Sequence, residues 1–194
     1  MALHYIYPAN YRVHILFYTQ TEKKKFIMIT FKTATPNDIG AICGIARKTW
    51  FITYKAILSK EQLDYMFEMM YSKTALKHQL IDKKQVFYIA YISDEPLGYV
   101  SIEKQNDDLY HLHKLYVLPD CQSKGIGKAL IKEAFDYARK TSKRKKCAVE
   151  LNVNRHNKAF DFYIKMGMHI NREGDFDIGN GFFMNDYIMR IDLL

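Results

Sequence analysis

The sequence predicts an α/β (α+β) domain built on a single mixed, mostly antiparallel sheet that is flanked by helices. Three strand-like segments between residues 86 and 117 are joined by short turns, which is typical of an antiparallel meander. Helical periodicity occurs before this meander and again after it, where it alternates with strand-like segments. A length of 194 residues favours one domain.

Capping and turn signals place the individual elements. Thr35-Pro36-Asn37-Asp38 follows an expected strand at residues 27–31 and offers a hydroxyl cap, a proline and an acid for a helix start. Ser59-Lys60-Glu61-Gln62 is a second capping box, and the helical stretch at residues 74–81 either stands alone or continues that second helix. The remaining elements are expected as strands at residues 86–92, 97–103, 109–117 and 147–153, helices at 126–138 and 157–165, and final strands at 168–171 and 182–191 around a glycine-rich loop at 174–181.

The composition excludes several classes of protein. Hydrophobic residues make up 48% and charged residues 26%, so a disordered chain or a fibre is excluded. No apolar run reaches the roughly 18 residues of a membrane span, and the N-terminus lacks a signal-peptide pattern. Cys43, Cys121 and Cys147 are odd in number and widely spaced. They predict neither a disulfide framework nor a metal site, and they suit a reducing cytoplasm.

The net charge of +8 favours an anionic partner, which can be nucleic acid, a phosphate group or a membrane surface. The charge does not choose among these partners, and a basic nucleic-acid-binding protein is a less favoured alternative function. The sequence has no aromatic RNA-binding signature on a strand and no clustered recognition helix. We therefore expect neither a specific nucleic acid nor a membrane as partner, and a homodimer stays open.

One loop carries a chemical signal. Gln122-x-x-Gly125-x-Gly127 joins the end of an expected strand to the start of a helix. Unpaired N–H groups at a helix start attract anions, two glycines allow close approach, and Lys124 and Lys128 add positive charge. The pattern predicts a phosphate-binding loop, although a plain strand–helix turn explains Gly-x-Gly alone equally well. It is neither a P-loop nor a dinucleotide fingerprint, since Leu130 replaces the third glycine of the latter.

Two motifs together resemble a known family. The segment Leu115–Leu130, with LYVLP and QSKGIGKAL, is similar to the acyl-CoA motif of the GNAT N-acetyltransferases. Asn154-x-x-Asn157-x-Ala159-x-x-Phe162-Tyr163-x-x-x-Gly167 resembles their second motif, in the same order. The resemblance covers about residues 27–194, and Thr53–Ser59 is similar to the branch with the spermidine/spermine acetyltransferases. It implies the acyl-CoA N-acyltransferase (GNAT) fold.

The resemblance also implies an acetyl-CoA-dependent N-acetyltransferase that moves acetyl directly to a primary amine, which is a small molecule such as a polyamine or a peptide amine. In this family the loop amides hold the CoA pyrophosphate, and the preceding strand end pairs with the pantetheine arm. Asn157 would bind that arm, and Tyr163 would protonate the leaving thiolate, unless Tyr163 is only a core residue. The implied cofactor-binding residues are Leu115, Tyr116, Val117, Gln122, Ser123, Lys124, Gly125, Ile126, Gly127, Lys128 and Asn157.

The sequence leaves the general base and the acceptor open. An amine must lose a proton before it attacks, because its pKa is near that of lysine, about 10.4. The candidate bases are His111, His113, Glu150 and Asn152, the last two through a water. A polyamine would need acids at the acceptor end, although acids on an amphipathic helix usually face solvent. The candidates for these acids are Glu61, Asp64, Glu68, Asp175 and Asp177.

The sequence leaves one alternative function and one alternative mechanism open. A CoA-binding regulatory protein without turnover would keep the same loop, and Tyr163 argues against it. An acyl-enzyme on Cys121 is less favoured than direct transfer, because Cys121 lies where the loop turns.

The N-terminal extension, residues 1–27, has a doubtful status. It shows no regular period, yet it is rich in apolar and aromatic residues. It is either an upstream extension from a misjudged start or an arm that packs on the domain. The first interpretation is favoured, since the strands of the GNAT domain at 28–194 are complete without it.

Overall fold

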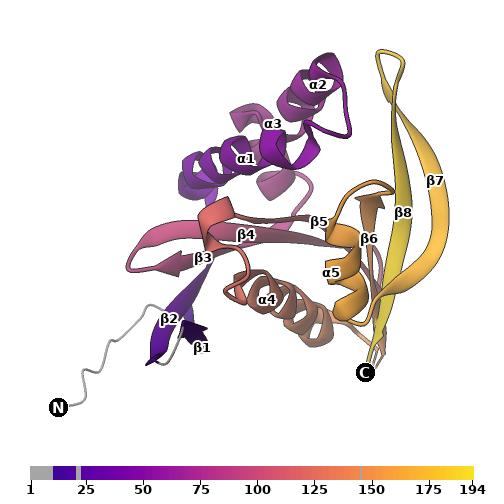
Figure 1. Ribbon diagram of the computed structural model, residues 1–194. Helices are drawn as coiled ribbons and strands as arrows, with labels where there is room; N and C mark the ends of the chain where they lie inside the picture. Colours follow the sequence, from indigo (N-terminus) through magenta and orange to yellow (C-terminus); the bar gives the residue numbers. More distant parts are fainter. Residues whose placement is uncertain (1–10, 21–22, 145) are drawn as a thin grey trace.

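The computed structural model describes residues 11–20, 23–144 and 146–194, with only the backbone described for residues 14–20 and 23–27. One eight-stranded sheet has the order β1-β2-β3-β4-β5-β6-β8-β7. The β5–β6 pair is parallel, and the other neighbours are antiparallel. The predicted mixed, mostly antiparallel sheet is confirmed (Figure 1). The strands are β1 (Tyr11–Gln20), β2 (Lys23–Thr33), β3 (Val86–Ile92), β4 (Glu95–Lys104), β5 (Leu109–Val117), β6 (Cys147–Asn154), β7 (His169–Gly179) and β8 (Phe182–Leu193).

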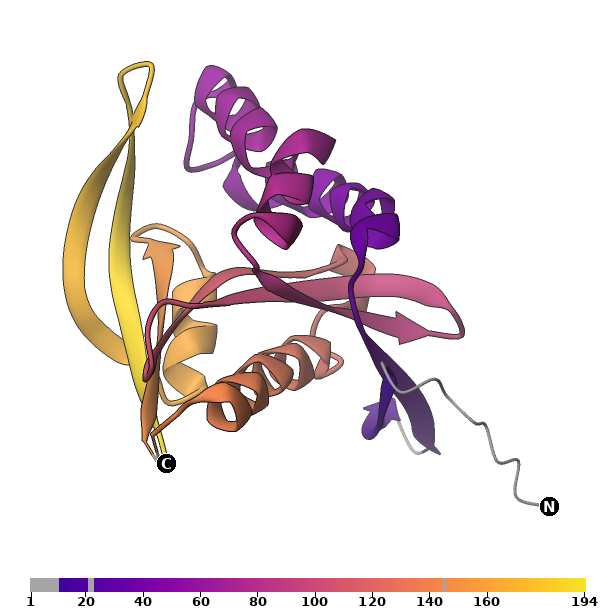
Figure 2. The same cartoon turned by 180° about the vertical axis from the view of Figure 1, so that it is seen from behind.

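Helices cover both faces of this sheet, as the two opposite views show (Figures 1 and 2). The helices are α1 (Ile39–Tyr54), α2 (Lys60–Tyr71), α3 (Lys73–Ile81), α4 (Ile126–Thr141) and α5 (Ala159–Lys165). α1, α2 and α3 lie on one face, where Trp50 and Tyr99 are among the fully buried side chains. α4 and α5 lie on the other face, where Leu130 and Ile131 are fully buried. The sheet therefore separates two hydrophobic cores.

Capping side chains fix where the first helices begin. The Asp38 carboxylate accepts hydrogen bonds from the Thr35 backbone N–H and hydroxyl, each at 2.8 Å. The Ser59 hydroxyl accepts from the Gln62 N–H at 3.2 Å. Ser72 has extended backbone with ψ 153°, and its hydroxyl caps the next helix. The third helix therefore stands alone and does not continue the second.

Two regions differ from the sequence prediction. Tyr11–Gln20 forms β1, which pairs with β2 in an antiparallel register, so part of the N-terminal segment is a regular strand; residues 1–10 and 21–22 lie outside the described part. Most of the expected glycine-rich loop is strand, because β7 continues to Gly179 along β8 and only Asn180 and Gly181 form the turn. Pairing with a long neighbour outweighs the low strand propensity of Gly and Asp here.

Candidate active site

The site lies where β5 and β6 separate. Their parallel pairing runs from Leu109 opposite Ala148 to Leu112 opposite Leu151 and goes no further. Beyond it, the end of β5 stays paired with β4 on its other side, through Val117 opposite Gly98. A parallel strand that loses its neighbour exposes a row of backbone N–H and C=O groups. These groups can pair with an extended ligand.

The loop after β5 has an unusual backbone. Ser123 and Gly125 adopt left-handed conformations, with φ of +62° and +80°, and Gly125 is the N-cap of α4. A left-handed residue next to a helix start turns successive N–H groups toward one side. The Gln122 side chain donates to the Val117 carbonyl at 3.1 Å and ties the loop to the strand end. The Lys124 ammonium donates to the Asp120 carbonyl at 2.7 Å.

An open cavity of about 1100 Å³, here called the splay cavity, occupies the gap between β5, β6, α5 and the end of α1. Ten of the twelve predicted site residues line it; the other two are Lys124 and Ile126. Ile126 is 1% exposed and belongs to the core, so its side chain cannot face a ligand. The lining members are Leu115, Tyr116, Val117, Gln122, Ser123, Gly125, Gly127, Lys128, Asn157 and Tyr163.

Two polar side chains of the second motif have different surroundings. Both polar atoms of the Asn157 side chain are engaged, since its amide nitrogen donates to the Tyr54 hydroxyl at 3.2 Å and its oxygen accepts from the Ala159 N–H at 2.9 Å. Tyr163 is 8% exposed, and its hydroxyl has no hydrogen bond among the described residues. Burial raises the pKa of Tyr163, so its hydroxyl keeps its proton at neutral pH.

A second cavity, of about 520 Å³, lies under α1, α2 and α3 and is here called the helix-side cavity. It meets the splay cavity, because five residues line both. The two cavities are therefore adjacent, and these five residues form their junction. The shared residues are Tyr54, His113, Lys114, Tyr116 and Asn152.

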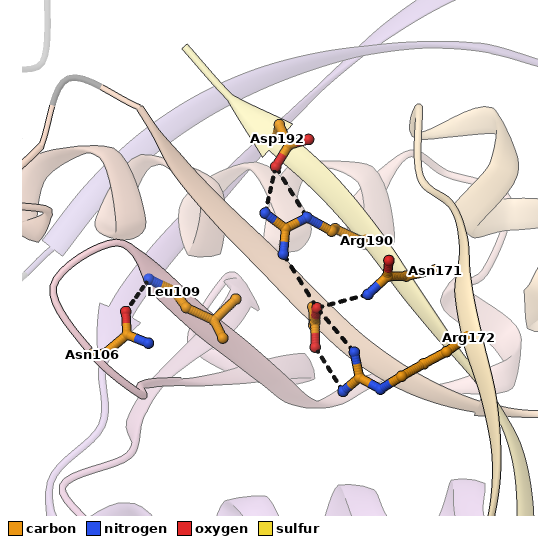
Figure 3. Close-up of polar contacts among 7 residues, drawn as sticks. Asn106, Leu109, Asn171, Arg172, Arg190 and Asp192 are labelled. Carbon is orange, nitrogen blue, oxygen red and sulfur yellow. Dashed lines mark hydrogen bonds and ion pairs between the residues drawn. The ribbon is translucent and has the colours of Figure 1, made fainter.

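Glu150, one of the predicted bases, lines neither cavity. Its carboxylate is held by Arg172 at 3.1 Å, Arg190 at 3.3 Å and the Asn171 amide at 3.0 Å (Figure 3). Burial alone would raise the pKa of Glu150, but the two guanidinium groups outweigh it and lower that pKa. A carboxylate held in this way links β6 to β7 and β8.

The two candidate histidines line the helix-side cavity, with ring centroids 4.7 Å apart. His113 Nε2 lies 2.9 Å from the Glu103 carboxylate. Burial lowers the pKa of both His113 and His111; the neighbouring His111 and Lys114 lower that of His113 further, whereas Glu150 opposes the shift of His111. Both imidazoles are therefore neutral at physiological pH.

A carboxylate that the sequence did not point to, Asp186 on β8, also lines the helix-side cavity. It is 5% exposed, and burial raises its pKa, while the hydrogen bond from Asn152 opposes the rise. A buried carboxylate of raised pKa accepts a proton more readily than an ordinary one.

The acids expected at the acceptor end do not line the helix-side cavity. Asp64 pairs with Lys60 on the surface of α2, and Asp175 pairs with Arg155 at 2.9 Å. Cys121 lines neither cavity. Among the described residues, no cluster of His, Cys, Asp or Glu could hold a metal ion, and no helix is long and apolar enough to cross a membrane.

Three residues at the site escaped the sequence analysis: Tyr54, Lys114 and Asp186. Tyr54 ends α1 within the segment Thr53–Ser59, so the family resemblance offered a signal for it. Lys114 and Asp186 carry no motif. Their place at the cavity depends on which strands the topology brings together.

Comparison with known proteins agrees with this geometry. Residues 54–182 match the family described as the acetyltransferase (GNAT) domain. The chain is 29% identical to spermidine N(1)-acetyltransferase of Thermoplasma acidophilum over 149 residues, which cover 73% of this chain and 89% of that protein. It is 36% identical over 90 residues to an uncharacterized N-acetyltransferase of Methanocaldococcus jannaschii, which cover 42% of this chain and only 38% of that protein.

A solved structure shows the same fold. It is the PaiA N-acetyltransferase of Thermoplasma acidophilum in complex with coenzyme A, with a TM-score of 0.70 and 26% identity. The match covers 84% of this chain and 97% of that one. The chain belongs to the GNAT family of acetyltransferases, and the predicted class of enzyme, an acetyl-CoA-dependent N-acetyltransferase, is confirmed.

Proposed function

We propose that this protein moves an acetyl group from acetyl-CoA to a primary amine in one direct step, with acetyl-CoA in the splay cavity and the amine in the helix-side cavity. The observation that carries the proposal is the junction of the two cavities, where five residues line both. An acyl donor and an acceptor held on opposite sides of this junction can react without an acyl-enzyme.

The splay cavity suits acetyl-CoA, which supplies the acetyl group as an activated thioester. The N–H groups from Gln122 to Gly127 and the start of α4 are suited to bind the pyrophosphate, aided by Lys128 at the cavity wall. The β6-facing backbone of Leu115 to Val117 offers hydrogen bonds to the pantetheine arm and to the thioester carbonyl. Asn157 contributes to acetyl-CoA binding by positioning Tyr54, to whose hydroxyl it donates a hydrogen bond.

Two groups move the protons in this proposal. Tyr163 donates its hydroxyl proton to the departing thiolate, supported by its place in the splay cavity and its lack of a hydrogen-bond partner among the described residues. Asp186 accepts the proton that the amine loses, supported by its burial in the helix-side cavity and its raised pKa. Direct transfer is also supported by the position of Cys121 outside both cavities.

The acceptor is a primary amine, and two sources of it enter the test: a small molecule such as a polyamine and a peptide N-terminus. Similarity to the spermidine N(1)-acetyltransferase of Thermoplasma acidophilum supports the first source. We propose a cytoplasmic location, supported by three free cysteines, and no nucleic acid or membrane as partner. A homodimer is a further proposal, supported by the outer edge of β7, which pairs with no other strand among the described residues.

The test measures binding and turnover separately on the full chain. Calorimetry with acetyl-CoA reports binding, and release of the CoA thiol reports turnover with spermidine, amino acids, aminoglycosides or peptides. We expect micromolar acetyl-CoA binding and amine-dependent thiol release, which Cys121→Ser retains. Acetyl-CoA binding without turnover for any amine would point to a regulatory CoA-binding protein. Salt-sensitive binding of random DNA without acetyl-CoA binding would point to a nucleic-acid binder.

A further inference from the structure

Lys114 is a buried cation in the wall of the helix-side cavity. It lies on β5 and is 6% exposed. Its ammonium lies 5.6 Å from the centroid of the Tyr71 ring and 5.9 Å from that of Phe87, which places it over two aromatic faces. Among the described residues, its ammonium forms no hydrogen bond and no ion pair. Glu103 favours the charged form from a distance, but its carboxylate is engaged by His113 and Gln85.

The charges around this cavity do not suit a polycation. Among the residues that the structure describes, the charged lining consists of two carboxylates, Glu103 and Asp186, and two lysines, Lys83 and Lys114. The acids that would attract a polyamine lie elsewhere, so the cavity has no excess of negative charge. The positive charge of Lys114 would repel the nearby ammonium groups of a polyamine and would therefore weaken polyamine binding in this cavity.

A buried charge without a partner is costly, and burial lowers the pKa of Lys114 to about 8. Aromatic faces recover only a part of this cost. An anionic group on the ligand would supply the missing partner in a desolvated place, where a charge-assisted hydrogen bond is strong. At neutral pH most of the Lys114 side chains carry the charge that such a group needs.

We infer that the acceptor amine also carries a carboxylate, as an amino acid does, and that Lys114 is the residue that binds this carboxylate in the helix-side cavity. The inference rests on the proposed function and names the class of its acceptor. Asp186, on β8, lines the same cavity and takes the ammonium end. The cavity thus presents one cationic and one anionic group to a molecule that has one of each.

The experiment compares each common amino acid with its own C-terminal amide, which has nearly the same shape and lacks the carboxylate charge. Spermidine is the polycationic probe. Initial rates of CoA thiol release give kcat/KM for the full chain and for Lys114→Met, whose side chain is similar in length and suits aromatic surroundings. The control is Lys77→Met, which removes the same charge from an exposed position on α3 outside both cavities.

We expect at least one free amino acid to exceed its amide by about tenfold to a hundredfold in kcat/KM, as a charged hydrogen bond provides. Lys114→Met should remove this preference mainly through KM, and Lys77→Met should keep it. The melting temperature of Lys114→Met should equal or exceed that of the natural chain, since an unpaired buried charge is lost. A preference for spermidine or for amides that Lys114→Met leaves unchanged would overturn the inference.

A binding measurement separates this failure from failure of the proposed function. Calorimetry in the presence of CoA compares the N-acetyl form of each amino acid with the N-acetyl amide. Stronger binding of the acids that depends on Lys114 supports the anion site even if no amine is acetylated, in which case only the proposed function fails. Equal binding of acids and amides to the natural chain contradicts the anion site.

Discussion

The Asn152 side chain on β6 donates a hydrogen bond to Asp186 Oδ2 on β8, with 3.2 Å between the two atoms. Asn152 lines both cavities and Asp186 lines one, so this bond joins the junction to the only carboxylate besides Glu103 in the described lining of the helix-side cavity. The pairing of β6 with β8 sets this geometry, because Asp186 lies opposite Asn154 in the register.

Asp186→Asn tests the proton acceptor. The amide cannot take a proton from the amine, so kcat/KM should fall by about 10²–10⁴-fold, while acetyl-CoA affinity is retained. The natural enzyme should gain activity as pH rises through the raised pKa of Asp186, and the variant should lack that limb of the pH profile. Asp94→Asn, in an exposed turn, serves as the control. An unchanged pH profile in Asp186→Asn would assign the base elsewhere.

Tyr163→Phe tests the proton donor. The variant keeps the ring in its packed position and loses only the hydroxyl, so we expect unchanged acetyl-CoA affinity and a kcat lower by about 10²–10⁴-fold. A smaller loss is expected if product release limits turnover. The matched control is Tyr88→Phe, a tyrosine of similar burial that lines neither cavity. Equal kcat values for the two variants would show that Tyr163 is a core residue.

Gly125→Val tests the loop. Gly125 has φ of +80°, a conformation that costs a β-branched residue about 1–2 kcal/mol, and any relaxation would turn the loop N–H groups away from the anion. We expect acetyl-CoA affinity to fall at least about tenfold. Gly44→Ala in α1, where an added Cβ meets nothing within 4 Å, controls for the loss of a glycine. Unchanged affinity in a folded variant would refute the pyrophosphate assignment.

The ion pairs of Glu150 should make the stability of the protein depend on pH. The pKa of Glu150 is lowered in the folded state from its ordinary value of 4.5, so its stabilising contribution is complete above about pH 4.5. The contribution is lost as pH falls through the lowered pKa. Glu150→Gln should reduce the free energy of unfolding at pH 7 by about 1–3 kcal/mol, because charged hydrogen bonds to Arg172 and Arg190 are lost.

The difference in unfolding free energy between Glu150→Gln and the natural chain should shrink at low pH. Urea unfolding at a series of pH values measures it. A difference that is independent of pH would show that the ion pairs contribute nothing measurable, as is common when one partner is exposed. Arg172 is such a partner, with 57% of its side chain exposed.

Arg12→Met tests whether the N-terminal strand belongs to the domain. The Arg12 guanidinium lies 3.0 Å from the Glu133 carboxylate on α4, and the Glu133 side chain is 1% exposed. Losing this charged contact should lower the free energy of unfolding by about 1–3 kcal/mol, seen in thermal melting. The exposed Lys48→Met is the control. A chain that starts at Met28 should melt still lower; if it melts like the full chain, residues 1–27 are an extension without a structural role.

Local patterns in the sequence determined most of the fold. The helix caps at Thr35 and Ser59, the meander at residues 86–117 and the amphipathic period of α4 each act over a few residues, so the chain itself displays them. The loop around Gly125 and the spacing from Asn157 to Tyr163 likewise predicted residues that line the splay cavity, because each motif is short and local. Here the family resemblance and the residue chemistry pointed to the same segment.

The tertiary structure decided the rest. Lys114 and Asp186 lie 72 positions apart in the sequence, and only the placement of β8 beside β6 brings both to one cavity. The same sheet order places Arg172 and Arg190 beside the Glu150 carboxylate. These ion pairs argue against Glu150 as the general base. Residue type and spacing determine which local structure forms, whereas the side chains that a cavity gathers depend on long-range strand pairing, which local periodicity does not encode.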